Sequence, residues 1–67
     1  MLHVRAIAPP ESTSEVLQLL GSSPAVTHLC VTENGARKPS GDVVSFDVAR
    51  ESATEILEAL RNLGLEH

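Results

Sequence analysis

Residues 41–64 read GDVVSFDVARESATEILEALRNLG, in which a strand pattern is followed directly by a helix pattern. From Asp42 to Ala49 the side chains repeat with a period of two residues, as in a β-strand with one buried face. This alternation predicts an inward and an outward set: Val44, Phe46 and Val48 inward, and Val43, Ser45 and Asp47 outward. Phe46 is the only aromatic residue of the chain, so the core is expected to be mostly aliphatic.

The second half of this stretch has the clearest helical pattern in the chain. Its apolar residues recur every three or four positions, at Ala53, Ile56, Leu57, Leu60 and Leu63. Such a stripe is typical of a helix that buries one face. The opposite face carries Glu51, Glu55 and Glu58, and we interpret these carboxylates as a solvated surface that complements the helix N-terminus. Gly64 is expected to end the helix.

The N-terminal part predicts another strand and helix. Leu2–Ala8 alternates between a mostly apolar face and a more polar one, which favours a strand. Ser12 and Glu15 have the spacing of a capping box, in which each side chain satisfies a free backbone amide at the start of a helix. We therefore expect a short helix over Thr13–Leu20, with Gly21 as its C-cap.

A third strand is expected from Ala25 to Thr32, because this segment is rich in β-branched residues. Strict alternation predicts two faces: Thr27, Leu29 and Val31 on one, and Val26, His28, Cys30 and Thr32 on the other. Asn34-Gly35 is a turn signal. We expect residues 33–41 to form a mobile surface loop that carries Arg37 and Lys38.

The predicted order is strand, helix, strand, strand, helix. Two strands joined through a helix are usually parallel, whereas the second and third strands are expected to form an antiparallel hairpin. One arrangement satisfies both conditions: an α+β, ferredoxin-like split β-α-β with strand order 1-3-2 and both helices on one face. In this fold a final strand lies beside the first one. Without it the Leu2–Ala8 edge is bare, and we expect the chain to self-associate.

Composition limits the possible functions. With 67 residues the chain has room for one small domain, and its net charge of -4 argues against a general nucleic-acid role. The lack of aromatic rings for base stacking excludes RNA binding by the open sheet face. The single cysteine fits a reducing compartment. Residues 65–67, Leu-Glu-His, match the start of a vector-encoded tag, so we expect the domain to span residues 1–64.

Five segments together resemble a known family: residues 1–5, 8–10, 41–44, 47–51 and 60–64. The chain resembles the N-terminal region of bacterial membrane proteins called the uncharacterised hydrophobic domain family, or domain of unknown function 389. The resemblance implies a ferredoxin-like or ACT-like module placed ahead of a multi-helix membrane domain, with a further strand between the two. That family has no established activity, so the resemblance assigns no catalytic residues.

The open face of the sheet is the place where polar side chains are expected to converge. It offers His3 and Arg5 from the first strand and Ser45 and Asp47 from the central one, which we take as candidate ligand or interface residues. His3, His28, Cys30 and Asp47 are also suitable ligands for zinc. The outer strands lie about 9.6 Å apart, however, so His3 and His28 can share an ion only if they lean inward.

Two further candidates have simpler explanations. Cys30 and His28 could form a thiol–imidazole pair, but a catalytic thiol also needs a third, orienting group, and we expect a half-buried structural cysteine. Arg37 and Lys38 could bind a phosphate or a carboxylate, but no phosphate-loop motif surrounds them.

These observations predict a non-catalytic regulatory or interaction domain without a cofactor. We expect a homo-oligomer, formed through the sheet edge or the open face, with room for a small ligand at the subunit interface. The parent is expected to be an integral membrane protein with this domain on its cytoplasmic side. The alternative is a metal-binding module that uses the His, Cys and Asp side chains of the open face.

Overall fold

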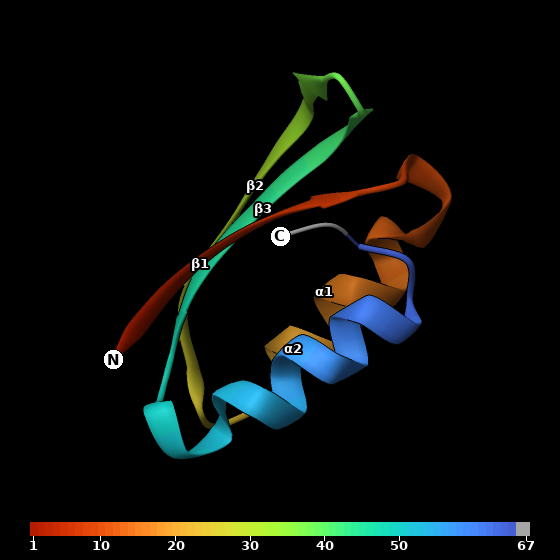
Figure 1. Cartoon of the computed structure of the whole chain (residues 1–67). Coiled ribbons are helices and arrows are strands. Elements are labelled where there is room, and N and C mark those ends of the chain that lie inside the picture. Colours follow the sequence, from red (N-terminus) through yellow and green to blue (C-terminus); the bar gives the residue numbers. More distant parts are fainter. Residues whose placement is uncertain (66–67) are drawn as a thin grey trace.

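The computed structural model describes residues 1–65 and has an α+β architecture (Figure 1). The regular elements, in chain order, are β1 (Leu2–Ala8), α1 (Thr13–Gly21), β2 (Val26–Arg37), β3 (Ser40–Val48) and α2 (Ala53–Asn62). One turn of 3₁₀-helix precedes each α-helix, η1 (Pro10–Ser12) and η2 (Arg50–Ser52). The strand order is β1-β3-β2, with β3 antiparallel to both neighbours. The predicted fold class is therefore confirmed.

Both helices cover the same face of the sheet (Figure 1). Alternate residues of β1 and β3 point towards them, and the side chains of α1 and α2 complete the core. The largest side chains that are fully buried are those of Phe46, Leu20, Leu60, Val16, Val44 and Val48. The inward and outward sets predicted for β3 are confirmed, because Val44, Phe46 and Val48 are buried whereas Val43, Ser45 and Asp47 are partly exposed.

The predicted faces of β2 are partly wrong, because the strand contains a β-bulge. Thr27 pairs with Asp47 and Cys30 with Ser45, so two residues of β2 lie opposite one residue of β3. His28 occupies this irregularity with φ 55°, a left-handed backbone conformation that histidine adopts more often than most residues. The extra residue resets the alternation. Val26 therefore joins Leu29 and Val31 against the core, and Thr27 lies on the open face.

The predicted mobile loop over residues 33–41 is also wrong. β2 continues to Arg37 and pairs with Ser40 at the start of β3, so that only Lys38 and Pro39 connect the two strands. The turn signal at Asn34 belongs instead to a second irregularity, where residues 33–35 lie opposite Asp42. Asn34 has φ 55°, and an asparagine tolerates this conformation equally well in a bulge and in a turn.

The helix ends differ from the sequence interpretation in two of three places. The capping box is not formed. Ser12 has φ -103° and ψ -9°, not the extended backbone of a capping residue, and its side chain makes no cap bond. Its N–H donates to the Pro9 carbonyl at 2.8 Å and is therefore not free for Glu15. Gly21 is the last residue of α1 and Ser22 is the C-cap. Gly64 ends α2 with φ 86°, as expected.

Among residues 1–65, β1 lies at one edge of the sheet and pairs with β3 alone. Met1 and Leu2, at its start, are the exposed large hydrophobic residues among those described. Leu65, which we assigned to a tag remnant, is buried and packs with the core, whereas Glu66 and His67 lie outside the described residues. Within residues 1–65 neither α-helix is long and apolar enough to cross a membrane.

The close approach of β1 to β3 leads to a prediction about Gly41. A Cβ atom at this position would lie 2.5 Å from the backbone oxygen of Ala8, so Gly41→Ala must push the two strands apart. We expect a loss of about 1–3 kcal/mol in the free energy of unfolding, measured by urea denaturation.

Gly21→Ala is the matched control, because a Cβ there would meet no atom within 4 Å. Alanine also favours the helix over glycine, so this variant should gain about 0.5–1 kcal/mol. Equal stabilities for the two variants would contradict the structure around Gly41.

Candidate functional site

Three polar side chains meet on the open face of the sheet, which carries no helix among the described residues 1–65. His3 Nδ1 lies 2.8 Å from Asp47 Oδ1, and His28 Nδ1 lies 3.1 Å from Asp47 Oδ2. A carboxylate can only accept, so the ring nitrogen of His3 donates this hydrogen bond. We refer to His3, Asp47 and His28 as the histidine–aspartate cluster.

The cluster forms because of the strand register and the first bulge. His3 is directly opposite Asp47 in the β1–β3 pair, and Thr27 is opposite Asp47 on the other side. The bulge then brings His28, the next residue, within reach of the same carboxylate. The two imidazoles thus lean inward, as a shared site requires, but each approaches a different oxygen of the central aspartate.

The electrostatics of the cluster centre on Asp47. The hydrogen bond from His3 is the largest influence and lowers the pKa of Asp47 below its usual value of 3.8. Partial desolvation opposes this shift, and the charges of both imidazoles add to it. The side chains are nevertheless largely in water, with 67% of His3 and 78% of His28 exposed. Ion pairs in such a setting contribute little to stability.

The geometry does not favour a metal centre. Among residues 1–65 no three His, Cys, Asp or Glu side chains are placed to hold one metal ion. Cys30 is opposite Ser45, outside the histidine–aspartate cluster, and its thiol is free. Cys30 is also exposed, so the expectation of a half-buried structural cysteine is wrong. The bulge moves neighbouring side chains but leaves Cys30 on the face that no helix covers.

The other candidate residues lie in two separate places. Arg5 and Ser45 are opposite each other and form one row across the sheet with Cys30, next to the cluster. Arg37 and Lys38 lie at the exposed end of the β2–β3 hairpin, where Arg37 pairs with Ser40. The structure therefore brings His3, Arg5, Ser45 and Asp47 onto one surface and does not bring the two basic hairpin residues there.

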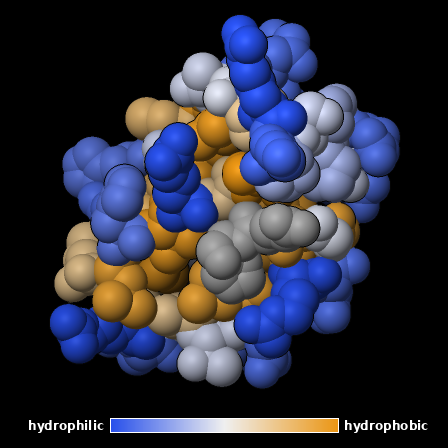
Figure 2. All heavy atoms as spheres, turned by 45° about the horizontal axis from the view of Figure 1, so that its top comes forward, coloured by the Kyte–Doolittle hydropathy of each residue, from blue (hydrophilic) through white to orange (hydrophobic). Residues whose placement is uncertain are grey.

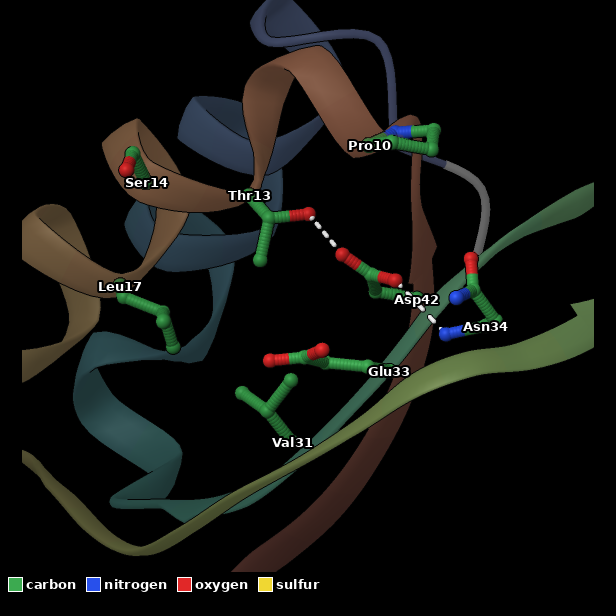
Figure 3. Close-up of a pocket in the computed structure, with 8 residues that line it drawn as sticks. All are labelled: Pro10, Thr13, Ser14, Leu17, Val31, Glu33, Asn34 and Asp42. Carbon is green, nitrogen blue, oxygen red and sulfur yellow. Dashed lines mark hydrogen bonds between the residues drawn. The ribbon is translucent and has the colours of Figure 1, made fainter.

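A second site lies on the helix side of the sheet. A groove of about 530 Å³ opens between the beginning of α1 and the β2–β3 hairpin (Figure 3). Its lining residues are Pro10, Thr13, Ser14, Leu17, Val31, Glu33, Asn34 and Asp42. We call it the α1–hairpin groove. Its volume lies within the range of about 300–1,000 Å³ that is typical of small-molecule sites.

Asp42 holds the two sides of this groove together. Its Oδ2 accepts a hydrogen bond of 2.6 Å from the Thr13 hydroxyl, and its Oδ1 accepts one of 2.8 Å from the Asn34 backbone N–H. Both hydrogen bonds lower the pKa of Asp42 below its usual value of 3.8, and the bond from Asn34 has the larger effect. Desolvation acts in the opposite direction. The carboxylate is therefore charged at neutral pH although only 8% of the residue is exposed.

The sequence interpretation did not identify this groove, although one signal was visible. Asp42 lies two residues before Val44 and so continues the alternating row of Val44, Phe46 and Val48. The period-two pattern therefore places its carboxylate on the buried face. A charged residue on that face needs partners. The sequence does not reveal those partners, Thr13 and the Asn34 amide. Hydroxyl side chains and backbone N–H groups are common along the chain, and nothing in the sequence marks which of them lie near Asp42.

Comparisons with protein-family models, with curated proteins and with solved structures find no match to this chain. The site must therefore be interpreted from its own geometry.

The lowered pKa values of Asp42 and Asp47 predict a loss of stability in acid. Both carboxylates take up protons more readily in the unfolded chain, so their contribution to stability is complete above about pH 5 and is lost as the pH falls through the folded-state pKa values. Urea denaturation at a series of pH values should show this decline.

Asp42→Asn should be less stable than the wild type at neutral pH and should lose less stability on acidification, because one of the two titrating carboxylates is absent. Wild-type stability that stays constant from about pH 5 to pH 2 would contradict the role of these hydrogen bonds.

The geometry of the cluster also predicts the response to zinc. Since His3 and His28 approach different oxygens of Asp47, we expect the same melting temperature with zinc chloride and with a chelator. A zinc-dependent rise that disappears in His28→Ala would instead establish the metal-binding alternative.

Proposed function

We propose that this chain is a non-catalytic interaction domain that associates with a second copy of itself through the β1 edge of its sheet. The single observation that carries the proposal is that, in the part of the chain that the structure describes, β1 pairs on one side only. The outer backbone N–H and C=O groups of an edge strand can add another strand without any change in the fold.

β1 has few of the features that block such pairing. Its pairing with β3 is regular from Leu2 to Ala8, with no bulge, and the strand contains neither proline nor lysine. Arg5 is its one formally charged residue at neutral pH. Edge strands that resist association usually carry bulges, prolines or charged residues, lysine above all.

Hydrophobic side chains lie at the start of the same strand, where Met1 is 68% and Leu2 is 37% exposed. Figure 2, turned by 45° from the view of Figure 1, shows hydrophobic residues in the middle of the face in view and hydrophilic residues around them. Burial of apolar surface is the main source of association free energy, so the exposed side chains of Met1 and Leu2 support contact between two copies.

We further propose that the domain is the N-terminal part of a larger bacterial membrane protein and lies on the cytoplasmic side of the membrane. The support is the resemblance of residues 1–64 to the uncharacterised hydrophobic domain family, together with the ferredoxin-like arrangement of the elements. In such a parent the further strand would itself pair with β1, so self-association through this edge is proposed for the chain of residues 1–67 alone. No observation favours the metal-binding alternative over this function.

The proposal predicts the effect of a charge placed on the edge. Light scattering of the wild-type chain over a range of concentrations should show a dimer that Leu2→Lys converts to a monomer, because a lysine at a strand edge must be desolvated when a second strand pairs. Circular dichroism and urea denaturation should show that the variant is still folded.

Thr54→Lys is the matched control, since it makes the same charge change on the exposed face of α2. It should leave the dimer intact. A wild-type chain that stays monomeric at every concentration would refute the proposed function. Equal dimerisation of the wild type and Leu2→Lys would show that the two copies do not associate through the β1 edge.

A further inference from the structure

The α1–hairpin groove lies on the opposite side of the sheet from the histidine–aspartate cluster. We infer that it is a binding site for a small organic cation, a primary ammonium group carried on a short apolar body. This inference does not depend on self-association through β1. It rests on the charge, the shape and the free hydrogen-bonding capacity of the groove.

The charged side chains that line the groove are both negative. Glu33 and Asp42 contribute two carboxylates, and no Lys, Arg or His is among the lining residues. An anion would meet repulsion from both side chains, and the positive end of α1 is already compensated by Asp42, which accepts the Thr13 hydroxyl bond. A cation is therefore the favoured ligand.

Glu33 supplies the free carboxylate. Figure 3 shows its side chain extending from β2 into the groove, between Val31 and Asp42. Within residues 1–65 its carboxylate has no hydrogen-bond or ion-pair partner, whereas each oxygen of Asp42 already accepts a bond. Glu33 is thus available to bind an ammonium directly, and Asp42 adds a fixed negative charge next to it.

The rest of the lining accommodates the remainder of such a ligand. Leu17 from α1 and Val31 from β2 provide apolar walls on opposite sides of the groove, and Ser14 offers a hydroxyl near the helix start. A metal ion fits less well, because two carboxylates are the only charged ligands and Asp42 is engaged in holding the fold. An alkylammonium matches both the carboxylate and the apolar walls.

The test is a titration of the folded chain with n-butylammonium chloride at neutral pH, followed by the backbone amide resonances in two-dimensional NMR. We expect saturable shifts at groove residues such as Ser14, Val31 and Asn34. n-Butanol has the same shape without the charge, and sodium butyrate has the opposite charge, so neither should produce these shifts.

Glu33→Gln keeps the size of the side chain and removes its charge, so the affinity for n-butylammonium should fall at least about tenfold. Glu58→Gln, on the exposed face of α2, is the control and should bind as the wild type does. Because Glu33 is exposed, neither variant is expected to impair folding.

Three results would overturn the inference. One is an absence of saturation, and another is equal binding by Glu33→Gln and the wild type. The third is a set of groove shifts that depend on protein concentration and not on the amine, which would mean that a second copy fills the groove. None of these results bears on the β1 edge, so the proposed function is tested separately by light scattering.

Discussion

One buried carboxylate connects the layers of this small fold. Asp42 begins the inward-facing row of β3, accepts the hydroxyl of Thr13 at the start of α1 and accepts the backbone N–H of Asn34 in the second irregularity of β2. These two bonds satisfy a charge that would otherwise be costly to bury. They also fix how far α1 lies from the hairpin, and hence they determine the width of the groove between them.

The central strand β3 separates two different chemical environments. Its buried face joins the helices through Val44, Phe46 and Val48, and its other face presents Asp47 to two histidines from the neighbouring strands. A sheet covered on one side only has one face free for contacts. Within residues 1–65 the face opposite the helices and the outer edge of β1 are two uncovered surfaces, and the groove on the helix side forms a third, separate one.

Much of the architecture could be predicted, because burial follows the periods of strands and helices. The inward row of β3, the apolar stripe of α2 and the strand order all agree with that prediction. The errors concern backbone irregularities. His28 and Asn34 both adopt positive φ values, and strict alternation cannot anticipate the extra residues that they insert. The asparagine signal was genuine, but it marked a bulge and not the end of the strand.

The candidate sites depended even more on the tertiary structure. The strand pattern and strand order identified His3, His28 and Asp47 as possible partners, yet only the register and the bulge show that both imidazoles approach one carboxylate. The sequence by itself determined the succession of strands and helices, the buried faces of β3 and α2 and the strand order, because these follow from local periodicity and short connections. Tertiary structure alone decided which polar groups meet, since Thr13 and Asp42 are 29 residues apart and His3 and Asp47 are 44 apart, and contacts over such separations depend on the packing of the whole chain.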